Sequence, residues 1–518
     1  FFRLQYIIIQ YEFNNNIKNI NRRTDMKNKS IMLQGTASNV GKSLICTALC
    51  RIFTEDGYNV NPFKSQNMSL NSYITAEGGE MGRAQVAQAE ACYKLPHTDM
   101  NPILLKPSTD KKSQIILNGK VFGNMKAMEY FKFKPNLKPE IEKTYKRLSD
   151  RSDIVVIEGA GSPAEINLKE NDIVNMGMAE IANAPVILVG DIDKGGVFAS
   201  LAGTIMLLTE EERKRVKGII INKFRGDVSL LKSGLVQIEE ITGVPVLGVV
   251  PMVDVDIEDE DSEADFIKYS KNKTGNIDVA VIKLPYISNF TDINALALEK
   301  NVNIRFVNNY EELENPDIII LPGTKSTMNA VKFLKEKNLF YSIREAYQNG
   351  TFVFGICGGY QLMGKAIYDE YSAESEQKFA EGLGILDIET YFEKEKTTVL
   401  SNGVENIFGE VVKGYEIHMG TEKKGANVKS FINFENGSDG AISKNGKAMG
   451  TYFHGIFDNG KFTRKFINMV RREKGVEEYN GDIVNFSDYK ESQYNKLAKI
   501  VRESIDMEKI YSIVREGF

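Results

Sequence analysis

The chain has 518 residues, which is too many for one ordinary hydrophobic core, so two or three domains are expected. Its 42% hydrophobic and 26% charged residues are typical of a globular protein, and it contains no apolar run of the roughly 20 residues that a membrane span needs. The net charge of −5, without a basic stripe, argues against nucleic acid as a partner, and four scattered cysteines fit a reducing cytoplasm.

Residues 1–25 are expected to lie outside the fold. The segment begins with Phe1, runs into an Asn-rich stretch and lacks the small-residue cleavage site of a signal peptide. Met26 stands just before the first predicted strand. The segment is therefore interpreted as upstream translation or a disordered extension.

Residues 26–253 are predicted to form an α/β domain around a parallel sheet. Short β-branched runs alternate here with helical segments, and their near-continuous apolar character indicates strands that are buried on both faces. The predicted strands are 30–33, 60–63, 153–157, 185–189, 218–221 and 246–250. The predicted crossover helices follow Gly41 and lie near 173–182, 198–208 and 230–241.

A phosphate-binding loop follows the first of these strands. It contains Gly35, Thr36, Gly41, Lys42 and Ser43, and an apolar helix comes next. Backbone N–H groups and Lys42 are expected to hold the phosphates of ATP, and the Ser43 hydroxyl is expected to bind Mg²⁺. The two glycines are one residue farther apart than in the standard motif, a form that resembles the dethiobiotin-synthetase branch of P-loop enzymes. The alternative is a chance Gly-Lys-Ser, but strand, loop and helix come in the required order.

Polar residues cluster directly after the second predicted strand. Lys64 is a candidate to neutralise a transferring phosphate. Gln66, Asn67, Ser69 and Asn71 are candidates to read polar groups of a substrate. A plain polar surface loop is the competing interpretation.

Three further strands also end in polar residues. Glu158 is expected to be a magnesium ligand together with the loop serine, against the alternative of an exposed acid. Either Asp191 or Asp193 is a candidate to orient metal-bound water, although a helix cap explains Asp193 equally well. Asn222 and the backbone near Pro251 are candidates to read the edge of adenine, with a simple turn as the alternative.

An acidic segment separates this unit from a second α/β unit. Eight of the twelve residues in 254–265 are Asp or Glu, and 254–275 is interpreted as a solvated linker rather than a metal site. Residues 276–518 are predicted to form the second domain, ending in a helical, charged tail from 462 to 514. Its predicted elements are strands at 277–284, 304–307, 317–321 and 351–356, one long helical pattern at 326–347, and short strands after 381.

Cys357 stands in Gly-Ile-Cys-Gly-Gly, directly after the strand at 351–356. A sharp strand-to-helix turn between glycines is what a nucleophile elbow requires. The turn would expose the thiol at a helix N-terminus, which favours the thiolate. The Gly358 N–H is then a candidate oxyanion donor, and Gly323, after the preceding strand, is a candidate second donor. The alternative is a buried structural cysteine.

Few residues can serve as the base for this thiol, because the chain has only three histidines. His454 follows a strand-like run and is the preferred base. The alternative is that His454 only packs in the structure, which is the usual role of a lone histidine. His418 is the other candidate in this half of the chain, and His97 lies in the first domain.

The motifs together resemble the cobyric acid synthase family of cobalamin biosynthesis. Gln-Asn-Met-Ser-Leu-Asn-Ser at 66–72 and Gly-Tyr-Glu-Ile-His at 414–418 look like motifs of that family. So do 34–43, 100–107, 191–198 and 222–227, all in the family's order. The resemblance runs from about residue 29 into the C-terminal region.

The resemblance implies a P-loop synthetase domain fused to a class I glutamine amidotransferase domain. It implies ATP and Mg²⁺ as cofactors, and L-glutamine and adenosylcobyrinic acid a,c-diamide as substrates, with four peripheral carboxylates (b, d, e and g) amidated to give adenosylcobyric acid. It also implies a substrate role for the 66–72 motif, Asp193 and His418. Class I glutaminases usually carry Glu two residues after the catalytic His, where this chain has Ile456, so another group must orient His454.

Two alternatives remain open. One is the sister enzyme cobyrinate a,c-diamide synthase, against which the 66–72 motif argues. The other is a partitioning-type P-loop ATPase with a non-catalytic glutaminase-like module, against which the presence of both Cys357 and His454 argues.

Overall fold

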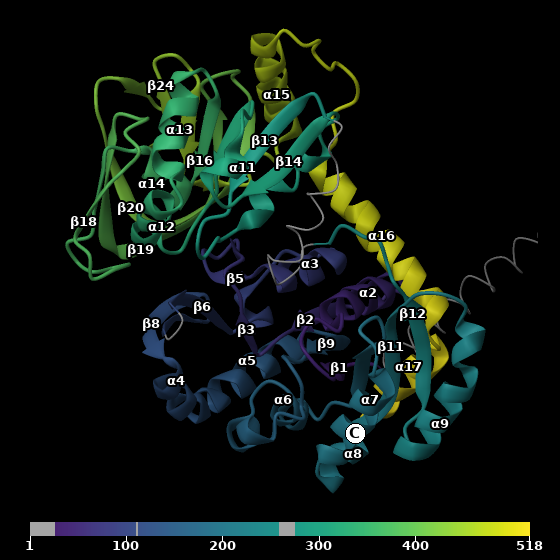
Figure 1. The fold of residues 1–518 in the computed structure, drawn as a ribbon. Helices are drawn as coiled ribbons and strands as arrows, with labels where there is room; N and C mark the ends of the chain where they lie inside the picture. The colour runs from purple at the N-terminus through teal and green to yellow at the C-terminus, as the bar shows by residue number, and fades with distance from the viewer. Residues whose placement is uncertain (1–25, 110–111, 258–274) are drawn as a thin grey trace, which may run out of the picture.

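The computed structural model describes residues 26–109, 112–257 and 275–518, which form two α/β domains (Figure 1). The predicted extension, 1–25, and most of the predicted acidic linker, 258–274, lie outside these residues. Among the described residues, no helix combines the length and the apolar character that a membrane crossing requires.

A six-stranded sheet forms the centre of the N-terminal domain, and every neighbouring pair of its strands is parallel. Its order is β12 (Val246–Pro251), β11 (Val216–Phe224), β10 (Val186–Asp191), β1 (Lys29–Gly35), β9 (Ile154–Glu158) and β2 (Val60–Phe63). Alternate residues of β1 and β9 enter two separate hydrophobic cores, one on each face of the sheet. All six strands coincide with the apolar runs of the sequence.

Helices cover both faces of this sheet (Figure 1). The main ones are α2 (Lys42–Glu55), α3 (Arg83–Ala91), α5 (Lys138–Asp150), α6 (Met176–Ile181), α7 (Val197–Leu207) and α9 (Lys232–Thr242). The carboxyl ends of the strands therefore carry the loops that were singled out in the sequence, as expected for an open parallel sheet.

A second, four-stranded sheet in this domain was not predicted. Its order is β3 (Gln66–Met68), β6 (Ile103–Thr109), β7 (Lys112–Leu117) and β8 (Lys120–Lys126). The turn between β7 and β8 is Asn118-Gly119, and both residues have positive φ, of 48° and 78°. Asn-Gly between two strands is a strong hairpin signal, which the sequence analysis did not use.

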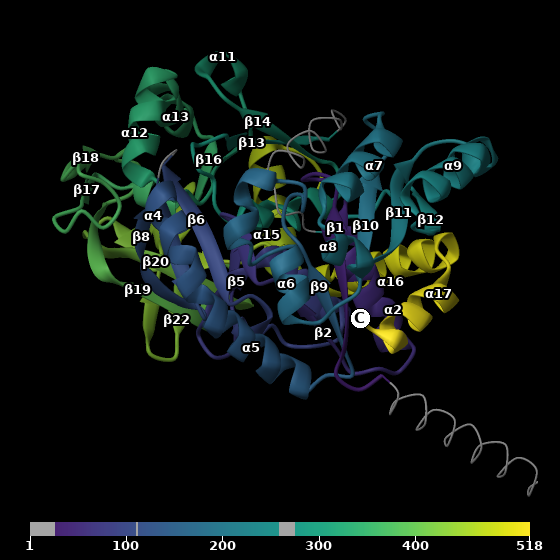
Figure 2. The same cartoon turned by 90° about the horizontal axis from the view of Figure 1, so that it is seen from below.

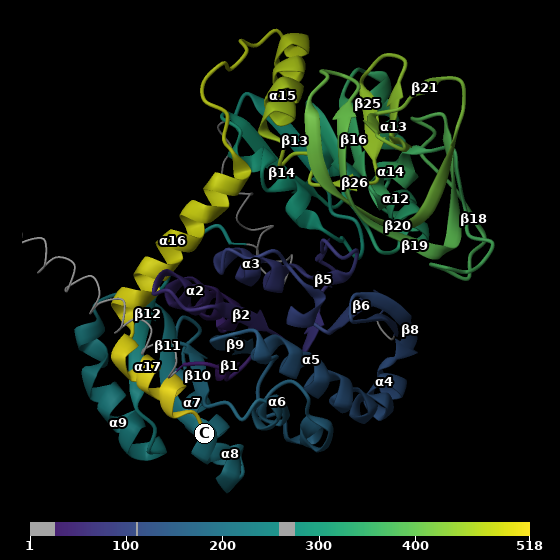
Figure 3. The same cartoon turned by 180° about the vertical axis from the view of Figure 1, so that it is seen from behind.

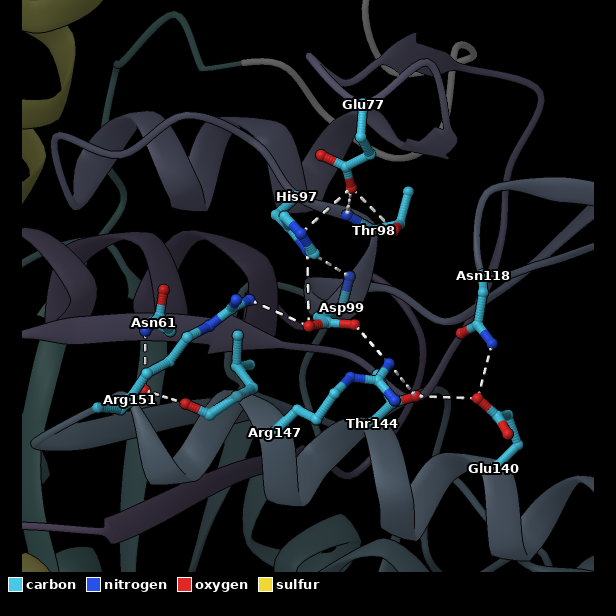
Figure 4. A network of polar contacts seen from close by, with 12 residues as sticks. Asn61, Glu77, His97, Thr98, Asp99, Asn118, Glu140, Thr144, Arg147 and Arg151 are labelled. Atoms are coloured by element: carbon cyan, nitrogen blue, oxygen red, sulfur yellow. Dashed lines mark hydrogen bonds and ion pairs between the residues drawn. The ribbon is translucent and has the colours of Figure 1, made fainter.

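A polar network fastens α5 to the short turn η1 (Thr98–Met100) (Figure 4). The nearly buried carboxylate of Asp99 accepts hydrogen bonds from Arg147 at 2.7 Å and from Arg151 at 3.1 Å. The His97 ring accepts the Asp99 backbone N–H through Nδ1 at 3.1 Å. His97 is thus a structural residue of this turn.

The C-terminal domain contains two sheets. The first has the order β14 (Val302–Val307), β13 (Ile277–Ile282), β15 (Ile318–Leu321), β16 (Phe352–Ile356), β25 (Ala448–Thr451), β24 (Ala441–Ser443) and β21 (Val428–Lys429), and its first five strands are parallel. The second is built on the long hairpin of β19 (Ile388–Glu405) and β20 (Val411–Lys424). It also contains β17 (Ala366–Tyr368), β18 (Phe379–Glu381), β22 (Ile432–Phe434), β23 (Gly437–Asp439) and β26 (Phe453–His454).

The helices of this domain pack on the first sheet (Figure 1). They are α11 (Tyr310–Leu313), α12 (Thr327–Glu336), α13 (Leu339–Gln348), α14 (Gly358–Met363) and α15 (Gly460–Lys474). The single helical pattern at 326–347 is in fact two helices. Asn338 separates them, because its left-handed φ of 57° cannot continue a helix.

The end of the chain returns to the N-terminal domain, which corrects the predicted domain boundary. Helices α16 (Phe486–Ser504) and α17 (Met507–Glu516) run from the C-terminal domain to the N-terminal domain (Figure 3). Leu497 and Val501 are buried in the same core as Cys50 of α2. The residues of 276–518 were predicted to form one domain, but the pattern of an amphipathic helix does not reveal which core receives its apolar face.

The two domains also meet at a hairpin of β4 (Ser72–Ile74) and β5 (Glu80–Gly82). This hairpin packs against β19 and β20 of the C-terminal domain, in the region where Figure 2 shows the two domains side by side. The Glu80 carboxylate is buried there and binds Lys106 at 2.6 Å and Lys396 at 2.5 Å, one lysine from each domain.

Candidate active site

Cys357 occupies a strained turn between β16 and α14. Its φ of 50° and ψ of −111° are rare for a residue with a side chain, and strain of this kind clusters at functional sites. A Cβ on Gly359 would lie 1.9 Å from the carbonyl oxygen of Leu321, so no other residue type fits there. The turn can form only with this glycine, and it presents the thiol at the carboxyl edge of the parallel sheet.

The His454 ring lies between the thiol and a carboxylate. It shares a hydrogen bond with the Cys357 thiol on one side, and its Nδ1 lies 2.7 Å from Oδ2 of Asp292 on the other. The other oxygen of Asp292 accepts the backbone N–H of Gly455 at 2.9 Å. Asp292 therefore holds both the ring and the backbone that follows it, and Cys357, His454 and Asp292 form a hydrogen-bonded triad.

The charges in this triad favour a thiolate–imidazolium pair. Burial alone would raise the pKa of the Cys357 thiol, but the hydrogen bond and the charge of His454 bring it below its ordinary value. Burial alone would lower the pKa of His454, but the Asp292 carboxylate and Cys357 raise it to about 10. A deprotonated thiol beside a charged imidazole is the reactive form of a cysteine nucleophile.

The predicted oxyanion donors flank this pair. The Gly358 N–H hydrogen-bonds to the Cys357 sulfur. A Cβ on Gly323 would lie 3.5 Å from Cε1 of His454, so the Gly323 backbone borders the same space. His418 does not take the place of the base, since its Nδ1 is bound to the Gly420 carbonyl oxygen at 2.7 Å and its ring stacks on Tyr452.

A cavity of about 530 Å³ opens beside the sulfur. Both domains line it, which places the thiol at the domain boundary. From the C-terminal domain come Cys357, Gln361, His418, Lys325, Glu374 and Lys396, and from the N-terminal domain come Lys106, Lys112, Gln114 and Asn124. A cavity of this size can hold a small polar substrate beside the nucleophile.

The phosphate loop lies between β1 and α2 as predicted from its pattern. The Lys42 ammonium donates to the carbonyl oxygens of Ala37 at 3.1 Å and Gly161 at 3.3 Å, which holds it over the loop. Gly41 has a left-handed φ of 94°, and a Cβ there would lie 2.1 Å from Nδ2 of Asn222. The loop therefore has the glycine-dependent backbone of a phosphate cradle, in which Gly35 ends β1 and Thr36 begins the loop.

Glu158 is the centre of a buried polar cluster next to the loop. Its carboxylate accepts from Ser43 at 2.8 Å, from Lys64 at 2.9 Å and from Gln88 at 2.5 Å. Burial alone would raise the pKa of Glu158, but the Lys64 ammonium and these hydrogen bonds bring it below its usual value. The predicted nucleotide and metal residues Lys64, Ser43 and Glu158 thus meet in one place.

Two other predicted nucleotide residues lie on adjacent strand ends. Asn222 lies two residues before the end of β11, and Pro251 ends β12. The Asn222 amide donates to the Val40 carbonyl oxygen at 2.9 Å, so it braces the phosphate loop. Asp193 is partly exposed and is paired with Arg225 at 2.8 Å.

The predicted substrate motif lies on β3 and in the turn that follows it. Gln66 accepts from Tyr130 at 2.6 Å, and the buried Asn67 donates to Gln85 at 2.8 Å. Ser69 Oγ accepts the Asn71 backbone N–H at 3.0 Å, closing a local turn.

The last residue of this motif, Ser72, lies close to the triad of the other domain. Its backbone N–H donates to Oδ1 of Asn289 at 2.9 Å. Nδ2 of the same Asn289 lies 3.5 Å from Nε2 of His454. The end of the motif is therefore separated from His454 by a single side chain.

Asp292 is the functional residue that the sequence analysis missed. It lies on the one-turn helix η5 (Phe290–Ile293), 162 positions before His454. The available signal was weak: an acid in the loop that follows β13, the first strand of the sheet that also carries Cys357. Since the carboxyl ends of parallel strands share one edge, acids after each strand of that sheet were the candidates to search.

Comparisons with known proteins agree with this architecture. Residues 29–258 match the AAA domain family, and residues 278–462 match the CobB/CobQ-like glutamine amidotransferase domain family. Cobyric acid synthase of Clostridium novyi (strain NT) is 56% identical over 95% of this chain and 99% of its own.

The chain belongs to the cobyric acid synthase family. Two further family members support this: those of Caldanaerobacter subterraneus subsp. tengcongensis (53% identical, 93% of this chain and 98% of its own) and Clostridium botulinum (strain Loch Maree / Type A3; 54%, 93% and 99%). As a member of the cobyric acid synthase family, the chain is an enzyme, a ligase of the glutamine amidotransferase kind. The fold class predicted from the sequence, a P-loop domain followed by an amidotransferase-like α/β domain, is confirmed.

Proposed function

We propose that this cobyric acid synthase family member uses ATP and glutamine to amidate four peripheral carboxylates (b, d, e and g) of adenosylcobyrinic acid a,c-diamide, giving adenosylcobyric acid. The observation that carries the proposal is the triad of Cys357, His454 and Asp292 beside a cavity that both domains line. Glutamine hydrolysis in one domain can thereby supply ammonia to chemistry in the other. The corrinoid substrate rests on the names of the relatives.

In the amidotransferase domain, the Cys357 thiolate attacks the side-chain amide carbon of glutamine. The oxyanion that forms accepts hydrogen bonds from backbone N–H groups, for which Gly358 and Gly323 are placed. The His454 imidazolium gives its proton to the departing amine, and ammonia leaves. Water, deprotonated by His454, then hydrolyses the thioester, which releases glutamate and restores the thiolate.

In the N-terminal domain, the phosphate loop and Lys42 hold the ATP phosphates, and Lys64 stabilises the charge of the transferring phosphoryl group. A substrate carboxylate attacks that group to give an acyl phosphate and ADP. Ammonia then displaces phosphate and forms the amide. We propose that the amide and hydroxyl groups of the 66–72 motif, with Asp193 and His418, contact the corrinoid, while Asn222 and Pro251 border the adenine.

The residues beside the phosphate loop fit Mg²⁺. The Ser43 hydroxyl oxygen donates a hydrogen bond to a carboxylate oxygen of Glu158 at 2.8 Å, so two oxygen atoms lie together beside the loop. Oxygen is the ligand atom that Mg²⁺ prefers. A bound Mg²⁺ would neutralise phosphate charge. Ser43, Glu158 and the phosphates themselves are the proposed ligands.

The test is an assay with adenosylcobyrinic acid a,c-diamide, ATP, Mg²⁺ and either glutamine or ammonia, with the product mass read out. The expected product carries four new amides with either nitrogen source. If the enzyme amidates cobyrinic acid only at its a and c positions, the chain is instead a cobyrinate a,c-diamide synthase. If it releases no ammonia from glutamine, the proposed mechanism is wrong.

A further inference from the structure

Glu374 and Lys325 both line the Cys357 cavity, and each can form further hydrogen bonds with a ligand there. Oε1 of Glu374 accepts the Thr327 backbone N–H, whereas Oε2 is buried and has no hydrogen-bond partner among the described residues. Lys325 lines the same cavity, and among the described residues its ammonium takes part in neither a hydrogen bond nor an ion pair. A buried oxygen without a partner is costly, so the position of Glu374 favours a ligand that donates to Oε2, and the Lys325 ammonium is available to the same ligand.

The loop that carries Glu374 is held firmly. The buried carboxylate of Asp369 accepts the backbone N–H groups of Ala373 at 2.7 Å, Glu374 at 3.0 Å and Ser375 at 2.9 Å. The backbone of Lys325 is held as well, because its N–H donates to the Tyr286 carbonyl oxygen at 3.0 Å. The Glu374 carboxylate is therefore positioned in advance, which reduces the entropy lost when a ligand binds.

The electrostatics of the two groups agree with this arrangement. Burial raises the pKa of Glu374 to about 8, and the nearby Asp369 charge adds to the effect. Burial also lowers the pKa of Lys325, as does the charge of Lys106. The charge of Lys325 opposes the shift of Glu374, and the charges of Glu80, Glu374 and Cys357 oppose the shift of Lys325, but burial outweighs them in both cases. A ligand that carries both an ammonium and a carboxylate would supply a further counter-charge to each group.

We propose that Glu374 binds the α-ammonium of glutamine and Lys325 binds its α-carboxylate, so that the pair selects a free α-amino acid as the nitrogen donor. The inference rests on the proposed function and names the residues that recognise its nitrogen donor. With the two charges bound, the side-chain amide extends toward Cys357, which lines the same cavity. Glu374 and Lys325 are specificity residues that take no part in the bond changes.

The first test measures glutaminase kinetics of Glu374→Gln and Lys325→Met. Loss of a charge-assisted hydrogen bond is expected to raise the KM for glutamine about ten- to a hundredfold, with a much smaller change in kcat. Amidation with free ammonia should continue at the parent rate, which also shows that the variants fold. Glu374→Asp keeps the charge at shorter reach and should give an intermediate KM.

The second test uses two analogues that each lack one charge: glutaramate has no ammonium, and 4-aminobutanamide has no carboxylate. Glu374→Gln should weaken the use of glutamine but not of glutaramate. Lys325→Met should weaken the use of glutamine but not of 4-aminobutanamide. This crossed pattern assigns each side chain to one end of glutamine, which a merely structural role would not produce.

Matched controls come from exposed neighbours: Glu370→Gln in the same loop and Lys332→Met on α12 should leave the KM for glutamine unchanged. The KM of the parent enzyme should also fall as the pH rises toward about 8, where Glu374 ionises, and this dependence should disappear in Glu374→Gln.

Two results would overturn the inference while leaving the proposed function intact. One is an equal loss on glutamine and on both analogues. The other is a Lys325→Met variant that raises the KM for the corrinoid instead, which would assign Lys325 to a substrate carboxylate. A parent enzyme without glutaminase activity would overturn the proposed function itself.

Discussion

The phosphate loop and the cysteine elbow both follow a buried parallel strand, yet the charges around them are balanced differently. Beside the phosphate loop, Glu158 is neutralised by Lys64, which lies 94 positions earlier in the chain, and each of the two residues belongs to a motif at the end of a predicted strand. Beside the elbow, His454 depends on Asp292, which lies 162 positions away in the chain. Both sites thus join distant segments, but every charged partner at the first site lies in a motif that the sequence singled out, whereas Asp292 at the second lies in none.

The largest expected effect comes from a substitution that removes the activity of one site and leaves the other intact. Cys357→Ala should abolish amidation with glutamine but leave amidation with free ammonia, because only the ammonia source is lost. Product formation with each nitrogen source is the measurement. If the variant still hydrolyses glutamine, the cysteine is not the nucleophile.

Lys42→Ala should impair the other site. Loss of one charge contact to the phosphates in a water-excluded site is expected to reduce synthesis by about 10²-fold or more. The reduction should be the same with glutamine and with ammonia, since acyl phosphate formation precedes nitrogen attack. Undiminished ammonia-dependent synthesis would rule out the role given to the phosphate loop.

Asp292→Asn tests the dependence of the elbow on a distant residue. The parent glutaminase should be active above the lowered pKa of Cys357 and lose activity as the pH rises through about 10, where His454 loses its proton. Without the Asp292 charge, the pKa of His454 falls, so this alkaline limb should move to lower pH and kcat should fall about 10²-fold. Ammonia-dependent synthesis should not change.

Ile456→Val is the matched control, because Ile456 occupies the position at which other class I glutaminases carry the acid. Its side chain is fully buried, so the substitution should cost about 0.5–1.5 kcal/mol of stability and leave the pH profile of glutaminase in place. A shifted profile in this variant, or an unshifted one in Asp292→Asn, would contradict the assignment of Asp292.

A smaller effect is expected from the helix that joins the two regions. Leu497→Ala on α16 removes a buried side chain from the core of the P-loop domain and should destabilise that domain by about 2–5 kcal/mol. Hydrogen exchange should become faster in β1 and β12 but not in β13 and β16. The exposed neighbour Lys499→Ala should change neither. Faster exchange in β16 instead would mean that α16 stabilises the amidotransferase domain.

Much of the fold was open to prediction from local pattern. Continuous apolar runs identify buried parallel strands because neither face of such a strand meets water. The antiparallel strands β7 and β8 were missed because β8 is largely exposed and carries no strong hydrophobic alternation, so only its Asn118-Gly119 turn marks it. The helical pattern at 326–347 did not show the break at Asn338, since a single left-handed residue leaves the apolar periodicity nearly intact.

The sequence by itself determined which residues form the phosphate loop and the strained elbow, because a glycine or a reactive side chain at a fixed spacing after a strand leaves little other choice of backbone. Only the tertiary structure decided that Asp292 orients His454, that residues 486–516 complete the core of the first domain, and that Glu374 and Lys325 face the cavity of Cys357. These are contacts between segments far apart in the chain. Such contacts follow from which strand ends and apolar faces the fold brings together, and no spacing along the sequence records them.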